Sequence, residues 1–286
     1  MLSVNLFHIK KNHGIRRHLR NEMIKSDIML KTIFIFLILI SFNSNLLSQN
    51  KVFSEGEELN YIVYYGFIKL GEVKMRITGR TAENDNTVYS SRCVMRSYSG
   101  IPFVSLNSVF ESDMVFNGKE VYSKKFKATE YKEDAVVTVE YKFNYDSDFV
   151  HVQKINGGKV EIDEKIHFNK NIKFQDGLSL LYNSRLNSFS TENFLIPVFM
   201  NEAETSVSYY FSSKKDEISI DLFNYDIQSV RCNGVANFEG VFGLSGEFAG
   251  WFSNDEARIP LKAQMNVIIG NVTLELDSFR RAGWKP

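Results

Sequence analysis

The sequence is poor in the residues that most often carry chemistry. It contains two cysteines and five histidines in 286 residues, and only His151 and His167 follow residue 50. No close Cys or His pair is available there to complete a tetrahedral zinc site. There is no Gly-x-Ser-x-Gly nucleophile elbow, and no glycine-rich loop followed by Lys-Ser or Lys-Thr that would hold a phosphate. We therefore expect no catalytic residue, no metal and no cofactor.

Long apolar runs are also missing. The longest, Ile33–Ile40, belongs to a stretch of about ten apolar residues, half of the roughly 20 that a membrane-spanning helix needs. It follows Lys31 and is followed by small and polar residues, a pattern typical of a secretory signal peptide. A buried core helix is the alternative interpretation.

This leader predicts the organisation of the chain. We expect residues 1–49 to be an N-terminal extension plus signal peptide, with the true start at Met23 or Met29. Residues 50–286 are then a single exported domain without a transmembrane segment, acting in the periplasm or at the cell surface.

Charge is balanced overall but uneven along the chain. Of the 34 Lys and Arg residues, seven lie before residue 50, together with two of the 34 Asp and Glu residues. Residues 50–286 therefore carry 27 basic and 32 acidic side chains, a net charge of −5. Nucleic-acid binding needs a concentrated basic face that neutralises phosphates, so this balance argues against a nucleic-acid partner.

The two cysteines, Cys93 and Cys232, are far apart in sequence. Outside the cytoplasm they can form a disulfide, which would stabilise the fold by about 4–5 kcal/mol by closing so long a loop. Cys93 also lies in an alternating strand pattern, which is the ordinary setting of a buried free thiol. The sequence leaves both interpretations open.

Alternation of polar and apolar residues dominates the chain after residue 50. In 71–78, Val73, Met75 and Ile77 share one face while charged and polar residues share the other. One face packed against the core and one face exposed to solvent are typical of antiparallel sheets. The predicted strands are 58–65, 67–79, 86–98, 104–117, 120–132, 135–145, 148–154, 159–168, 193–200, 204–212, 216–225, 228–240, 246–253 and 258–279, the last being either two strands or one bent strand.

One segment departs from this pattern. Leu178, Leu181, Tyr182 and Arg185 follow helical spacing, and Asp176 stands where an N-cap belongs. We therefore expect an all-β fold, a large antiparallel meander curled into a barrel-like or half-open barrel sheet, with one short helix as a plug or cap.

Three stretches together resemble a known family. They are Phe53–Tyr61 with Tyr65–Glu72, Gln175–Tyr182, and Trp251–Pro260 followed by Gly270–Leu274. They resemble the opening strand, the short helix and the closing W-x-S-x-D-x-x-R-x-P strands of the bacterial envelope family called domain of unknown function 3108. The resemblance covers about residues 52–280 and implies an exported β-rich protein without an assigned enzyme activity. Comparison with the open barrels of lipoprotein carriers is fold-level analogy.

The closing motif also has a direct physical interpretation. Asp255 lies in a predicted turn after Trp251, and Arg258 begins the next strand beside Pro260. A carboxylate–guanidinium pair across this hairpin would be a structural clamp. The functional alternative is that Arg258 binds an anionic headgroup.

Aromatic residues are the best lead to a ligand. They are more numerous than a thin sheet needs, and among them Tyr61, Tyr65 and Phe103 are candidates for the lining or rim of a cavity. Phe103 lies in the apolar tract 99–105, which suits a rim loop. The alternative is a filled core.

These observations leave three hypotheses. The leading one is a non-enzymatic envelope protein that binds an apolar or lipid-like ligand or a partner protein, and the second is a structural or assembly factor with a solid core. The least favoured is a hydrolase with carboxylates brought together by folding. A lined apolar cavity larger than roughly 300 Å³ would favour the first, and two buried carboxyl groups facing each other would favour the third.

Overall fold

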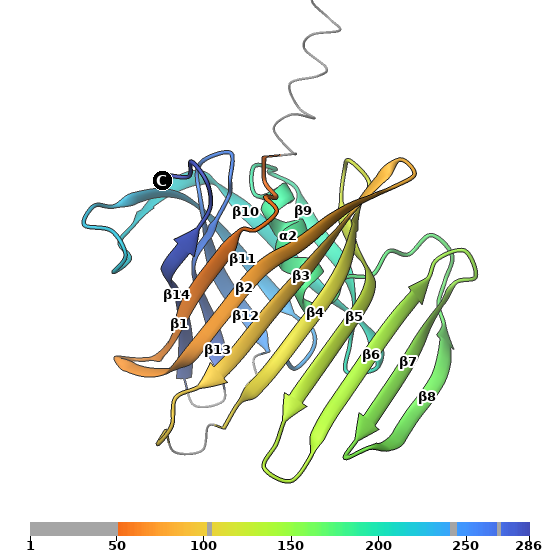
Figure 1. Cartoon of the computed structure of the whole chain (residues 1–286). Coiled ribbons are helices and arrows are strands. Elements are labelled where there is room, and N and C mark those ends of the chain that lie inside the picture. Colours follow the sequence, from red (N-terminus) through yellow and green to blue (C-terminus); the bar gives the residue numbers. More distant parts are fainter. Residues whose placement is uncertain (1–50, 102–104, 241–244, 268–269) are drawn as a thin grey trace, which may run out of the picture. The chain divides into compact units, whose positions relative to one another are not determined.

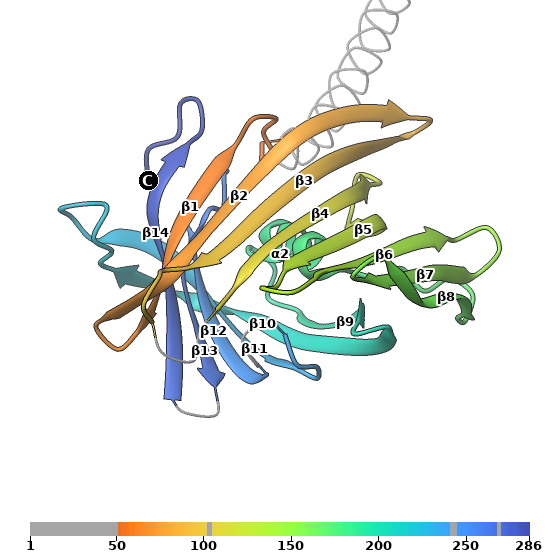
Figure 2. The same cartoon turned by 60° about the horizontal axis from the view of Figure 1, so that its bottom comes forward.

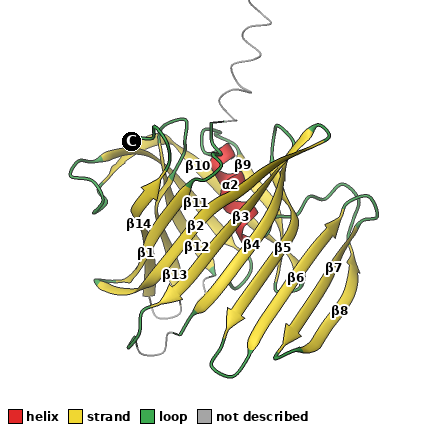
Figure 3. Cartoon of the chain, viewed as in Figure 1, coloured by secondary structure: helices red, strands yellow, loops and turns green. Residues whose placement is uncertain are grey.

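The computed structural model describes residues 51–101, 105–240, 245–267 and 270–286. The signal-peptide and start-site predictions therefore lie outside the described residues. In the described part the chain forms a 14-stranded antiparallel sheet and one helix, α2 (Gly177–Asn187) (Figure 1, Figure 3). The strands are β1 (Glu58–Tyr65), β2 (Ile68–Glu83), β3 (Asn86–Ser97), β4 (Asn107–Phe116), β5 (Val121–Tyr131), β6 (Val136–Asn144), β7 (Phe149–Asn156), β8 (Lys159–His167), β9 (Asn193–Met200), β10 (Ala203–Ile218), β11 (Ile227–Ala236), β12 (Gly246–Ser253), β13 (Pro260–Val267) and β14 (Gly270–Arg280).

The sheet is two meanders joined side by side. Its order is β8-β7-β6-β5-β4-β3-β2-β1-β14-β13-β12-β11-β10-β9, so β1 pairs with β14 and joins the two ends of the domain. The strands curl around α2, which lies inside the curve (Figure 2). This confirms the predicted barrel-like meander with one short helix.

The two edge strands of the curled sheet, β8 and β9, are not paired with each other. Instead, a short segment connects the two halves of the sheet by hydrogen bonds. The amide of Ser123 on β5 donates to the carbonyl of Phe174 at 2.9 Å. The next residue, Gln175, exchanges hydrogen bonds with β9: its amide donates to Pro197 O at 2.9 Å, and its carbonyl accepts from Phe199 N at 2.9 Å. The segment 174–175 thus bridges β5 and β9, and β6, β7 and β8 extend beyond the closed part (Figure 1).

The same segment starts the helix. The Asp176 carboxylate accepts from the amides of Leu178 at 2.7 Å and Ser179 at 3.0 Å, and the Ser179 hydroxyl accepts from the Asp176 amide at 2.8 Å. This reciprocal capping satisfies amides that have no partner within the helix. Asp176 is fully buried, and the Ser112 hydroxyl on β4 donates to it at 2.6 Å. The predicted N-cap is confirmed, and it also ties α2 to the barrel wall.

Strand boundaries differ from the prediction by a few residues in several strands, and most of all around β10. The sequence predicts separate strands at 204–212 and 216–225, whereas β10 runs unbroken from Ala203 to Ile218. A register shift between Phe211 and Lys215 keeps the strand paired to β11. Residues 219–226 form the connection to β11 instead. The segment 258–279, which the sequence left as one or two strands, holds β13 and β14.

Buried tyrosines give the fold a pH dependence. Burial raises the pKa of Tyr141 to about 12, and it also raises the pKa values of Tyr145, Tyr182 and Tyr209. Above pH 10, where an unfolded tyrosine loses its proton, the folded state still holds it, so the free energy of unfolding falls as pH rises. We expect Tyr141 alone to contribute a loss of about 2–3 kcal/mol by the time pH passes its folded pKa.

Urea unfolding followed between pH 8 and pH 12 measures this loss. The Tyr141→Phe variant removes one titrating group and should show a shallower decline than the wild type. An unfolding free energy that stays constant above pH 10 would contradict the expectation.

Candidate functional site

The inside of the barrel contains an apolar cavity. It has a volume of about 350 Å³ and lies between α2 and the inward faces of β1–β3 and β10–β14. Its size falls within the range of small-molecule pockets, about 300–1,000 Å³. Four of the five methionines after residue 50 line it: Met75, Met95, Met200 and Met265. Because methionine is flexible and polarisable, such a lining adapts to apolar ligands of different shape.

The space exists because small residues occupy inward positions. Gly250 on β12, Ala263 on β13 and Ala236 on β11 all line the cavity. A Cβ added to Gly250 would meet no atom closer than 3.4 Å, so the wall there has room. On the opposite side, Leu178 and Leu181 of α2 supply the apolar face that the helical spacing predicts.

Both cysteines also line the cavity. Cys93 and Cys232 are buried and free, so of the two interpretations left open by the sequence, the structure has two buried thiols and no bridge. They lie on β3 and β11, which are separated in the sheet by β2, β1, β14, β13 and β12. Burial raises the pKa of each thiol to about 12, which leaves almost no thiolate at neutral pH and makes both unreactive.

A buried charge cluster lies at the C-terminal half of α2. Arg185, fully buried, donates to both oxygens of Glu57 at 2.6 and 3.0 Å, and to the carbonyls of Val52 at 2.8 Å and Ala257 at 3.0 Å. Arg281 donates to the same carboxylate. Burial is the largest single influence and lowers the pKa of Arg185, but the charge and hydrogen bonds of Glu57, together with smaller effects of Tyr182 and Tyr61, outweigh it and the pKa is raised. The cluster ties the residues before β1, the helix and the β12–β13 turn together at this end.

The closing motif works differently from the predicted clamp. The Asp255 carboxylate accepts from the backbone amides of Ala257 at 2.8 Å and Arg258 at 3.1 Å, and from Trp284 Nε1 at 2.9 Å. The Arg258 side chain instead donates to the carbonyl of Leu186 at 2.6 Å, at the end of α2.

Arg258 therefore caps a helix rather than pairing with Asp255, because the last carbonyls of a helix attract a cation. Burial, together with the charge of Arg185, lowers the pKa of Arg258. Its guanidinium is 4.3 Å from the centre of the Phe189 ring, and the residue is only 7% exposed. It is not placed to bind a headgroup, which corrects that alternative.

The remaining sequence candidates are dispersed. Tyr61 is buried in the main core, where its hydroxyl donates to Pro260 O at 2.9 Å, so it does not form a rim. Tyr65 is half-buried at the end of β1 and packs against that core. Trp251 faces outward, and its Nε1 donates to Asp216 Oδ2 at 3.3 Å. Phe103 lies outside the described residues.

Sequence reasoning missed the methionines and the buried Glu57. The methionine signal was available, because Met75 and Met265 alternate with polar neighbours and share a face with Val73 and Ala263. Only the curl of the sheet shows that these faces meet around an unfilled space.

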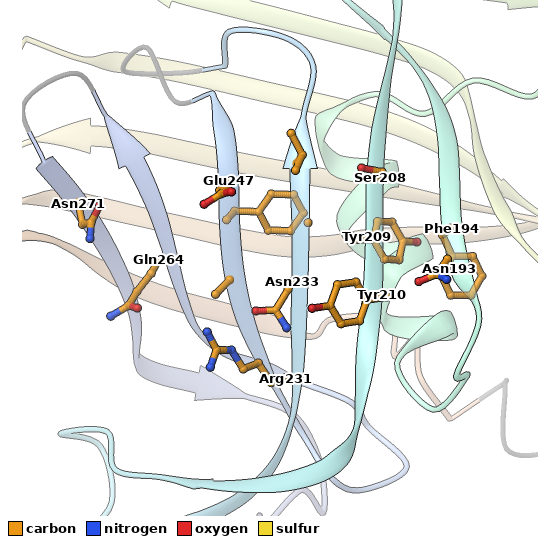
Figure 4. A pocket seen from close by; sticks show the side chains of 14 residues that line it. Asn193, Phe194, Ser208, Tyr209, Tyr210, Arg231, Asn233, Glu247, Gln264 and Asn271 are labelled. Atoms are coloured by element: carbon orange, nitrogen blue, oxygen red, sulfur yellow. The ribbon is translucent and has the colours of Figure 1, made fainter.

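A second hollow lies on the outer face of β9–β14 (Figure 4). It is larger, at about 620 Å³, but its lining mixes polar and apolar side chains and is open to water. The side chains come from neighbouring strands and include Asn193, Tyr210, Arg231, Asn233, Glu247, Gln264 and Asn271. It lacks the enclosed apolar character of a ligand cavity, so the interior cavity is the better candidate.

Two further observations bear on function. Among the described residues, no three His, Cys, Asp or Glu side chains come together in a way that would hold a metal ion. The one described helix is too short and too polar to cross a membrane.

Comparison with known protein families gives a match that extends over nearly the whole sheet. A family model described as "Protein of unknown function (DUF3108)" matches residues 60–277, from β1 to β14. No curated protein matches the chain.

Among solved structures, a β-barrel-like protein of domain of unknown function DUF1849 from Brucella abortus is similar, with a TM-score of 0.51 and 9% identity, covering 79% of this chain and 97% of that one. A protein with a YmcC-like fold from Bacteroides fragilis aligns with a TM-score of 0.33 and 8% identity, covering 80% of this chain and 97% of that one. At these identities, the likeness to the Brucella protein concerns the fold alone.

Proposed function

Because this chain belongs to the DUF3108 family of proteins of unknown function, its function has to be argued from its site, and we propose that it binds an apolar, lipid-like molecule inside the barrel. The observation that carries the proposal is the cavity of about 350 Å³ between α2 and the sheet, lined by methionines and aliphatic side chains. An apolar cavity without polar partners for water stays dry, and an apolar ligand gains free energy by filling it.

The place of action is part of the proposal. The basic leader with its short apolar run supports export, so we propose that the protein works in the periplasm or at the cell surface after the leader is removed. Binding of a partner protein remains the alternative within this function.

The other two hypotheses receive less support. A structural factor with a solid core does not account for the unfilled space. For a hydrolase, two buried carboxyl groups would have to face each other, but Glu57 and Asp176 lie at opposite halves of α2. Glu57 is paired with arginines, and Asp176 caps the helix, so each has a structural partner.

Filling the cavity tests the proposal. Ala263→Phe places a ring into the cavity from β13, and we expect it to weaken the binding of a fluorescent long-chain fatty acid by at least about tenfold, since each lost methylene contact is worth about 0.8 kcal/mol. Titration of the probe by fluorescence gives the dissociation constants. Gly250→Leu is a second filler at a position with room for a Cβ.

The matched control is Gln264→Phe, which adds the same ring on the adjacent, outward-facing residue. It should bind the probe as the wild type does. Equal affinities for Ala263→Phe, Gly250→Leu and wild type would refute an interior site. Native mass spectrometry of protein purified from its own envelope adds an independent measurement: a co-purifying lipid supports the proposal, and a bare mass under gentle conditions counts against it.

A further inference from the structure

The β1–β2 hairpin carries the most exposed large hydrophobic side chain of the described chain. Phe67 is 94% exposed at the apex of the turn, where Gly66 adopts a φ of 57° that a side-chain-bearing residue rarely takes. The next residue, Ile68, is 44% exposed, and Tyr98 is 37% exposed. Tyr98 lies beside the start of β2, because its amide donates to the carbonyl of Leu70 at 2.9 Å. Phe67, Ile68 and Tyr98 are called the rim patch below.

The rim patch lies at one end of the cavity. Val272 on β14 lines the cavity and pairs with two residues, Met265 on β13 and Tyr65 on β1. Tyr65 directly precedes the Gly66–Phe67 turn, so the hairpin tip projects just beyond the level of Met265 and Val272. The Glu57–Arg185 cluster lies at the other end of β1, where Glu57 directly precedes the strand.

The chemistry of the rim patch is apolar rather than basic. Lys69 follows it, with its ammonium 5.8 Å from the centre of the Tyr64 ring. Glu72 and Asp277 lie close enough to Tyr98 to raise its pKa, although burial is the larger cause. Charges of both signs therefore surround the patch. Any surface that it contacts is held by apolar insertion and not by a concentrated charge.

We propose that the rim patch inserts into the surface of a lipid membrane and holds this end of the cavity against it. With 94% of Phe67 exposed, its ring adds almost nothing to the packing of the described residues, so the fold does not explain a phenylalanine there. Three side chains on a protruding turn are far too few for a stable protein–protein interface, which uses about 20–30 residues a side. A few aromatic and aliphatic side chains do suffice for contact with the membrane interface.

This inference deepens the proposed function and rests on it. A lipid-like molecule that enters the cavity from a membrane crosses water unless the cavity end touches that membrane. The rim patch supplies that contact, so transfer from the bilayer proceeds without exposing the apolar molecule. With only three exposed apolar side chains in the patch, the contact is weak and reversible.

Co-sedimentation with vesicles of phosphatidylcholine, a zwitterionic lipid, tests the inference. We expect Phe67→Ser to lower the bound fraction by about tenfold, because the largest inserted side chain is lost. We expect Leu195→Ser, which removes the 71%-exposed leucine of β9, to leave it unchanged. Binding should also persist at high ionic strength, since insertion is apolar. Phe67→Trp should show a blue-shifted emission when vesicles are added.

Equal sedimentation of wild type and Phe67→Ser, or an unchanged emission of Phe67→Trp, would overturn the inference. Binding that vanishes in high salt would do the same, because it would assign the contact to charge. The two proposals are separated by titrating the fluorescent fatty acid without vesicles. Phe67→Ser should retain wild-type affinity for the probe, and Ala263→Phe should retain vesicle binding. If the wild type binds vesicles through Phe67 but takes up no probe, the proposed function fails and the membrane contact stands.

Discussion

Replacing Glu57 with glutamine is expected to lower the free energy of unfolding by about 3–5 kcal/mol. Its carboxylate is the partner of Arg185, which is fully buried, and of Arg281. The substitution leaves two guanidinium charges in a desolvated site without a counter-charge. Urea or thermal unfolding of the purified variant measures the loss.

Glu58→Gln is the matched control. Glu58 is the next residue and also pairs with an arginine, Arg280, at 2.8 Å, but that pair is exposed to solvent. Exposed pairs contribute about 0–1 kcal/mol, so this variant should unfold close to the wild type. If both variants lose the same stability, the buried cluster does not hold the end of α2 as the structure implies.

Gly71→Ala is expected to destabilise the fold by about 1–3 kcal/mol or more, the range for overpacked sites. A Cβ at position 71 would lie 2.2 Å from the carbonyl oxygen of Arg96 and 2.9 Å from the Cα of Ser97. Both are backbone atoms of β3, so neither can turn away as a side chain could. The paired strands have to separate, which disturbs the wall of the cavity. Thermal unfolding and probe binding report both effects.

Gly79→Ala gives the comparison on the same strand. A Cβ there would meet only the Cβ of Ser90 at 3.9 Å. Because alanine also reduces the conformational freedom of the unfolded chain, we expect this variant to be neutral or slightly stabilised. A Gly71→Ala protein as stable as Gly79→Ala would show that β2 and β3 can move apart at no cost.

Local pattern predicted most of the secondary structure. The alternation in 71–78 appears as β2, and the helical spacing of Leu178, Leu181 and Tyr182 appears as α2 with the predicted N-cap Asp176. Both patterns depend on neighbours within a few residues, which the sequence contains. Where a strand tolerated irregular residues, as β10 does between Phe211 and Lys215, the pattern predicted a break that is absent.

The site was less accessible to sequence reasoning. Asp255 and Arg258 are three residues apart, and a pair between them was the simplest expectation. In the structure, Arg258 reaches the carbonyl of Leu186, 72 residues away, while Asp255 binds amides of its own turn. Likewise, Arg185 looked like one member of a helix face, and only folding brings Glu57 to it across 128 residues. Contacts between residues so far apart in the sequence produce no pattern among neighbouring residues.

The amino-acid sequence alone determined a series of amphipathic β-strands and a single capped helix, because the direction of side chains along a strand or helix follows from their spacing. Whether the inward faces of the strands leave a cavity between them was decided by the curvature of the sheet. It also depended on where segment 174–175 connects β5 to β9. That curvature is a property of the assembled sheet and its helix, because it arises from packing between distant strands. The cavity, the buried arginines and the exposed hairpin tip at its end are therefore decided only in three dimensions.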